Sequence, residues 1–258
     1  MEPRTVAASH GWTWIVQGFS LFRRNPSTWL LLIVILFAAT KLLAVLPLLG
    51  ILFVLFMPVF IVGLMEGCRA LDNGEPLQLA HIASGFRKNA AQLVTIGGVS
   101  LVGNLAIMMI VLALGGESMS ILTKTISQGA SVTLPTSEAQ AAAATVLRAL
   151  VVGTLVSLPL LMALWYAPLL VYFHDLGPLA AMKSSLLACI KNTLPLLVYG
   201  LAILGAMFLA MPFAMALQQY DLALWLLAPV VLPSLYVSYK DIYLAGTARQ
   251  SGAGSVAS

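Results

Sequence analysis

The sequence contains six long runs of apolar residues, and these runs restrict the possible folds more than any other feature. They lie at about 27–46, 48–65, 90–114, 146–173, 193–217 and 222–240. Apolar stretches of roughly 18 residues or more are typical of membrane-spanning helices. The runs are apolar throughout rather than alternating, so they predict helices and not the strands of a membrane barrel.

Composition supports the same fold class. Of the 258 residues, 60% are hydrophobic and only 9% are charged, too few for a soluble domain to cover so much apolar surface. The spans and their connections use nearly the whole chain and leave no room for a soluble catalytic domain. We therefore predict an all-α, polytopic membrane protein with a single membrane domain over residues 1–246 and a disordered tail over 247–258.

Basic residues are unevenly distributed between the two ends of the predicted spans. With the N-terminus in the cytoplasm, ten basic residues fall inside and three fall outside or at the outer edge. The inner ten are Arg4, Arg23, Arg24, Arg69, Arg87, Lys88, Lys183, Lys191, Lys240 and Arg249, and the outer three are Lys41, Lys124 and Arg148. This bias predicts that both termini are cytoplasmic. No basic face with interleaved aromatic residues lies outside the membrane, so nucleic acid is not an expected partner.

A short junction recurs before three of the apolar runs. It is written Phe22-Arg23-Arg24-Asn25, then Phe86-Arg87-Lys88-Asn89, then Cys189-Ile190-Lys191-Asn192. Asparagine is a favourable first residue for a helix, and cations suit the end of the helix that comes before it. Each junction therefore predicts a turn at the cytoplasmic membrane surface, with Asn25, Asn89 and Asn192 opening an outward span.

The stretch before each junction carries apolar residues at helical spacing. These stretches are residues 5–24, about 76–88, and the segment that begins at Pro178. They predict amphipathic helices that lie in the membrane interface. In the first of them Trp12, Ile15, Phe19 and Phe22 share one face. This face either sinks into the acyl boundary or packs on the protein's own helices, and the sequence leaves both alternatives open.

The returning spans also resemble one another. Pro58, Pro168 and Pro233 are followed, seven or eight residues later, by Glu66, Asp175 and Asp241. Together with the junctions, this pattern predicts three two-helix repeats over about 5–66, 76–175 and 178–241. Each return span is expected to kink at its proline.

The repeat places an acidic residue and a basic junction at the same predicted depth. The basic residues Arg24, Lys88 and Lys191 are therefore candidates to pair with Glu66, Asp175 and Asp241. The alternative is that these charges are solvated at headgroup level, where an exposed pair contributes only ~0–1 kcal/mol.

The sequence contains no arrangement typical of catalysis. His10, His81 and His174 are not spaced as metal ligands on one helix face, so no catalytic residue, cofactor or metal is expected. Cys68 and Cys189 map to the reducing cytoplasmic side, where we expect free thiols. Residues 115–143 are rich in small residues and predict a loosely packed outer loop.

The first junction carries a resemblance to known proteins. The residues Trp12-Thr13-Trp14-Ile15, Gly18, Leu21-Phe22-Arg23-Arg24-Asn25-Pro26 and Trp29 resemble the opening of an uncharacterised family of bacterial six-span inner-membrane proteins. The repeated unit is distantly similar to the membrane domain of some glycerophosphodiester phosphodiesterases. The enzyme domain of those proteins is absent here, so its activity does not carry over to this chain, and the resemblance implies an inner-membrane location.

Two functions fit these observations. The first is a non-enzymatic protein of the inner membrane that organises lipid or partner proteins, with membrane lipids and a membrane protein as its expected partners. The second is a transporter or channel for a small or amphiphilic solute, in which the backbone freed at the prolines lines a cavity. The polar residues that would face such a cavity are Thr40, Asn104, Ser157 and Gln218.

Overall fold

The computed structural model describes residues 2–44, 47–127, 137–219 and 221–245, and no strand occurs in these ranges. The predicted tail over 247–258 lies outside them. The chain divides into two compact units, residues 1–97 together with 163–258, and residues 98–162. The helices are α1 (His10–Arg24), α2 (Pro26–Ala44), α3 (Pro47–Asp72), η1 (Leu79–Ala83), α4 (Ser84–Arg87), α5 (Ala90–Ser127), α6 (Ser137–Trp165), α7 (Ala167–His174), α8 (Pro178–Lys191), α9 (Thr193–Ala216), α10 (Leu222–Tyr239) and η2 (Lys240–Leu244).

Six helical segments are long and apolar enough to cross a membrane, which confirms the predicted fold class. They are Pro26–Leu43, Leu49–Asp72, Ala90–Thr123, Ser137–His174, Thr193–Ala216 and Leu222–Leu244. Each overlaps one of the apolar runs identified in the sequence. The three short helical stretches α1, η1 with α4, and α8 each come directly before one of these spans.

The smaller unit, residues 98–162, consists of the facing parts of α5 and α6. The two helices approach each other at glycines, since a Cβ added to Gly103 would lie 2.5 Å from the side chain of Leu160 and one added to Gly153 would lie 2.4 Å from Val111. The expectation of a loose loop over 115–143 is wrong for 115–127 and 137–143, because both stretches are helical. Alanine has the highest helix propensity, and Ala139 and Ala142 are buried.

In the larger unit, the core forms where the return helices meet. Helix α3 contacts α7 and α10. The buried residues of these helices include Val59, Val62 and Met65 of α3, Leu169 and Leu170 of α7, and Tyr236 and Tyr239 of α10. Aromatic side chains gather near the ends of these helices, where the Phe173 and Tyr239 rings stack with their centroids 5.6 Å apart. Helix α3 therefore packs against α7 and against α10 in this core.

Of the three prolines, only Pro168 lies beside a break in its helix. The helix ends at Trp165 and resumes at Ala167, and the backbone N–H of Tyr166 donates to the hydroxyl of Ser185 at 2.9 Å. This bond satisfies a backbone group that the interrupted helix would leave without a partner. Helices α3 and α10 continue through Pro58 and Pro233. All three prolines are buried.

The three short helical stretches share an unexpected orientation. Each packs inward through small residues and leaves large apolar residues exposed. In α1 the inward residues include Gly11 and Gly18, in α4 they are Ser84 and Gly85, and in α8 they are Ala181, Ser185 and Ala188. The exposed large residues are Trp12, Val16 and Phe19 in α1, Leu79 and Phe86 in η1 and α4, and Leu179, Leu187 and Ile190 in α8.

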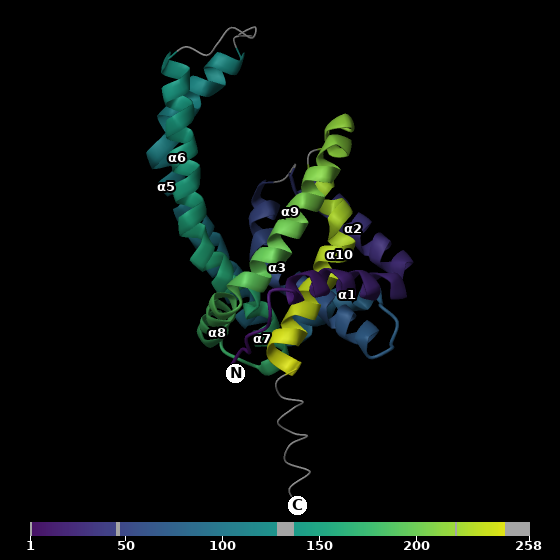
Figure 1. Ribbon diagram of the computed structural model, residues 1–258. Coiled ribbons are helices and arrows are strands. Elements are labelled where there is room, and N and C mark those ends of the chain that lie inside the picture. The colour runs from purple at the N-terminus through teal and green to yellow at the C-terminus, as the bar shows by residue number, and fades with distance from the viewer. Residues whose placement is uncertain (1, 45–46, 128–136, 220, 246–258) are drawn as a thin grey trace, which may run out of the picture. The chain divides into compact units, whose positions relative to one another are not determined.

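Close backbone contact explains the small residues. Helix α1 crosses α10 and α9 rather than running along them (Figure 1). A Cβ added to Gly18 would lie 2.7 Å from the backbone nitrogen of Ser234, and one added to Gly85 would lie 2.3 Å from the carbonyl oxygen of Val59. Any larger residue would push these short helices off the membrane-spanning helices beneath them.

Candidate functional site: the three asparagine junctions and the Asp241 pocket

Asn25, Asn89 and Asn192 each lie between the end of a short helix and the beginning of a span. The backbone carbonyl of each accepts the first hydrogen bond of the following helix. The donors are the N–H groups of Trp29 at 3.3 Å, Leu93 at 3.0 Å and Leu196 at 3.1 Å. The backbone carbonyls of the three asparagines therefore have the same role, since each accepts the first hydrogen bond of the span that follows.

The three amide side chains make different contacts. Only Asn25 accepts a capping bond from the helix it opens, a long one of 3.4 Å from the N–H of Thr28. Asn89 has a positive φ of 58°, a conformation that asparagine tolerates better than most residues, and its amide donates to Asp175 at 2.8 Å. The Asn192 amide is fully buried and contacts the N-terminal segment.

The structure brings together one of the candidate charge pairs. Lys88 Nζ lies 3.0 Å from Asp175, and the same carboxylate accepts from Asn89. The Asn89 amide, followed by Lys88, holds the pKa of Asp175 below its usual value. This pair is exposed to solvent, so its contribution to stability is small.

The other candidate pairs are not formed. Glu66 pairs with Arg69 on its own helix at 2.7 Å. Arg24 instead donates to the backbone carbonyl of Leu71 at 2.7 Å. Lys191 makes no ion pair with any residue in the described ranges.

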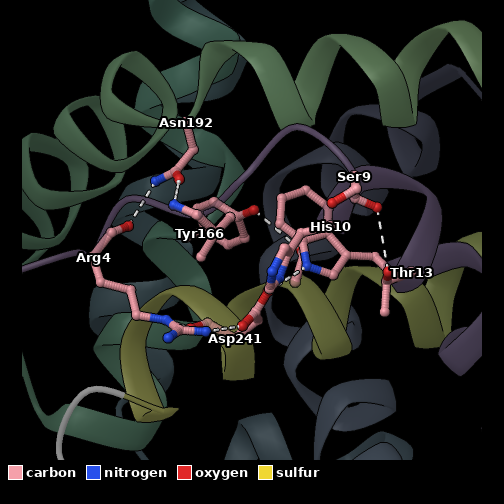
Figure 2. A network of polar contacts seen from close by, with 10 residues as sticks. Arg4, Ser9, His10, Thr13, Tyr166, Asn192 and Asp241 are labelled. Carbon is pink, nitrogen blue, oxygen red and sulfur yellow. Dashed lines mark hydrogen bonds and ion pairs between the residues drawn. The ribbon is translucent and has the colours of Figure 1, made fainter.

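Among the acidic residues in the described part of the chain, Asp241 accepts the most side-chain hydrogen bonds. Its carboxylate accepts hydrogen bonds from the Arg4 guanidinium, from His10 Nδ1 at 2.7 Å and from Trp14 Nε1 at 2.8 Å. Figure 2 shows how Arg4 and His10 converge on this carboxylate from the N-terminal segment and from α1. Asp241 lies in η2, a single π-helical turn, and such turns are frequent at functional sites.

Asn192 fixes the N-terminal segment beside this cluster. Its side-chain oxygen accepts from the N–H of Val6 at 2.9 Å, and its amide donates to the carbonyl of Arg4 at 2.9 Å (Figure 2). The Arg4 N–H in turn donates to Ile242 at 3.1 Å. The chain's beginning is thus hydrogen-bonded both to the third junction and to η2.

A pocket of about 640 Å³ opens beside the Asp241 cluster. One wall is the polar side of α1, the opposite wall is the end of α10 with η2, and Asp72 of α3 closes one end. The lining residues are His10, Thr13, Trp14, Gln17, Ser20, Leu21, Arg24, Asp72, Tyr236, Val237, Lys240, Asp241, Leu244 and Ala245. None of the residues predicted from sequence to face a transport cavity belongs to this lining.

Sequence reasoning singled out Asp241 but not the residues around it. Arg4, His10 and Trp14 are more than 220 positions away in the chain, so no local spacing connects them with Asp241. One signal was present: His10 and Trp14 are four residues apart, which places them on the same side of a helix. The acceptor they share was not visible in the sequence.

The described residues hold no group of three or more histidine, cysteine, aspartate or glutamate side chains that could bind a metal ion. Cys68 and Cys189 are free and buried. Burial raises the pKa of the Cys189 thiol to about 12, so this thiol stays protonated at neutral pH.

The comparisons with known proteins agree with a membrane location. No family model and no solved structure matches the chain. The sequence is similar to a probable inner membrane protein of Burkholderia thailandensis, with 30% identity over 256 residues that cover 94% of this chain and 93% of the relative.

Proposed function

Since the chain belongs to the same family of bacterial inner-membrane proteins as its Burkholderia relative, we propose that it is a non-enzymatic organiser of lipid or partner proteins. Its multi-pass location in the inner membrane follows from the relative and the six apolar helices. The organising role, and a topology with both termini in the cytoplasm, are the proposal.

The observation that carries the proposal is the outward display of large apolar side chains by the three short helical stretches. In α1, Trp12 is 59% exposed while Trp14, two residues on, is 1% exposed. The exposed side of α1 has no partner in this chain among the described residues, and bilayer lipid or another membrane protein would cover it. An interfacial helix held rigidly on the bundle by glycine contacts suits a protein that acts through its surface.

The alternative, a transporter or channel, has less support. The hydroxyls of Thr40 and Ser157 and the amide of Asn104 donate to carbonyls of their own helices. Gln218 is exposed. The three prolines are buried and line none of the pockets found among the described residues.

The test places a photoreactive amino acid at Trp12 in living cells, with the exposed turn residue Asn73 as the matched control position. We expect crosslinks from position 12 to phospholipid or to one membrane protein, and none of these from position 73. Equal crosslinking from both positions would contradict the proposal. So would protein-dependent efflux of a solute from reconstituted vesicles, which is the result that transport predicts.

A further inference from the structure

The pocket between α1 and η2 is lined by a polar sector that is distinct from the outward apolar side of α1. His10, Thr13, Gln17, Ser20 and Arg24 recur every three or four residues along this helix and all line the pocket. The sector offers hydroxyl, amide, imidazole and guanidinium groups. It spans about 20 Å of helix at 1.5 Å per residue, so the pocket is elongated along α1.

Both carboxylates in the pocket lining are already paired with cations. Asp72 pairs with Lys240, and Asp241 pairs with Arg4. Arg24 is the cation that remains, since its guanidinium makes no ion pair with any described acid. The lining therefore has a surplus of positive charge at the Arg24 end.

Arg24 is positioned to bind an anion. Its Nη1 donates to the carbonyl of Leu71 at 2.7 Å, which fixes the guanidinium at the end of α3. A guanidinium carries five N–H donors, so this one bond leaves others for a ligand. Arg24 lines this pocket and also a smaller one that it shares with Leu71 and Glu75. Planar guanidinium groups bind phosphate through two parallel hydrogen bonds.

The place of Arg24 in the chain indicates the depth of the site. It is the last residue of α1, and the first membrane-spanning segment begins two residues later at Pro26. A residue that directly precedes a span lies at the level of the lipid headgroups. Phosphate groups are concentrated at that level, and soluble phosphate esters also reach it from the cytoplasm.

We propose that the pocket between α1 and η2 binds a phosphoester, with Arg24 contacting the phosphate and with Ser20 and Gln17 beside it. The phosphoester is either the headgroup of an anionic phospholipid or a soluble phosphate ester. The proposal deepens the organising function when the ligand is a lipid, but its own test does not depend on that function.

Native mass spectrometry of the delipidated, detergent-purified protein provides the test. Phosphatidylglycerol and glycerol 3-phosphate are titrated separately onto the wild type, Arg24→Gln and Arg23→Gln. Arg23 is the matched control because it has the same charge but lies over the Phe19 ring, outside the pocket lining. We expect Arg24→Gln to weaken binding about tenfold, as for loss of hydrogen bonds to a charged group, and Arg23→Gln to leave it unchanged.

A second pair of variants tests the same pocket in case Arg24→Gln does not fold. Ser20→Phe fills the pocket from its wall, whereas Val16→Phe adds the same ring to the outward side of α1. We expect only Ser20→Phe to reduce binding. Wild-type binding of either ligand with this dependence supports the proposal and identifies the source of the phosphate.

Three results would overturn the phosphoester site. They are no binding of either probe to the wild type, equal losses in Arg24→Gln and Arg23→Gln, and equal losses in Ser20→Phe and Val16→Phe. None of them affects the crosslinking expected from Trp12, because that residue lies on the other side of α1. Failure of the site and failure of the organising function are therefore distinguishable.

Discussion

Of the residues at the third junction, we expect Asn192 to matter most for stability, and its side-chain amide is buried. Replacing it by alanine removes hydrogen bonds to Val6 and Arg4 at 2.9 Å and leaves these part-buried backbone groups without that partner. We expect Asn192→Ala to lower the free energy of unfolding by about 1–3 kcal/mol. Thermal unfolding of the purified protein in detergent measures this loss.

Asn25→Ala is the control at the first junction. It removes only the 3.4 Å capping bond to Thr28, which is at the weak end of the hydrogen-bond range. We expect Asn25→Ala to lower the free energy of unfolding by less than Asn192→Ala does. An equal or larger effect of Asn25→Ala would mean that the Asn192 contacts are not the ones that stabilise the fold.

The shifted pKa of Asp175 predicts how the stability of the protein depends on pH. Its pKa is held below the usual value by Asn89 and Lys88, so its stabilising contribution is present above the unfolded pKa of about 3.9. That contribution is lost as the pH falls through the lower, folded pKa. We expect Asp175→Asn to melt slightly below the wild type at neutral pH and to match it in acid.

Melting curves of both proteins from neutral to acid pH measure this difference. Asp72→Asn is the comparison at an acid with a different partner, Lys240. A difference between Asp175→Asn and wild type that grows in acid would show that the Lys88 and Asn89 contacts do not favour the ionised carboxylate.

Among the elements, α1 depends on a glycine for its contact with α10. Gly18→Ala places a methyl group 2.7 Å from the backbone nitrogen of Ser234, which cannot move without shifting α10. Gly200→Ala is the matched control, because nothing lies within 4 Å of its added Cβ. We expect Gly18→Ala to lower the melting temperature and to increase proteolysis before Asn25.

Gly200→Ala should be neutral or stabilising, since alanine has the better helix propensity by up to about 1 kcal/mol. A Gly18→Ala protein that is as stable and as protease-resistant as Gly200→Ala would show that α1 does not pack as closely on α10 as the structure has it.

The elements were predictable from sequence to different degrees. The six spans could be predicted because uninterrupted apolar runs need no tertiary context. The inward side of α1 could not, because periodicity detects large apolar residues such as Trp12 and Phe19, and these are the exposed ones. In a membrane protein, lipid can accept large side chains while glycine makes a helix contact, so hydrophobic spacing alone does not identify the inward side.

The charge contacts were predictable only where they are local to a junction. Lys88 and Asp175 were candidates because Lys88 comes before one span and Asp175 comes after another, at the same predicted depth. The Arg4, His10 and Trp14 contacts with Asp241 depend on how the N-terminal segment crosses η2, and no residue pattern encodes that path. Helix α5 continues past residue 114 and α6 begins before residue 146. The sequence does not predict these extensions, because a stretch rich in Gly, Ser, Thr and Ala is also typical of a loop.

For the whole molecule, the threefold repeat stays a prediction. The structure gives each asparagine the same backbone role, but their side chains contact different partners, and only one of the three candidate charge pairs is formed. The shared features are a short helix that packs inward through small residues, a basic junction and a span. The threefold repeat requires all three junctions to lie at the same, cytoplasmic surface of the membrane.

Labelling of single cysteines tests this topology most directly. Arg24→Cys, Lys88→Cys and Lys191→Cys place exposed thiols at the three junctions, in a background where Cys68 and Cys189 are alanine. A membrane-impermeant maleimide should modify all three in inside-out vesicles and none of them in intact spheroplasts. Modification of any one of the three from the periplasmic side would contradict the account.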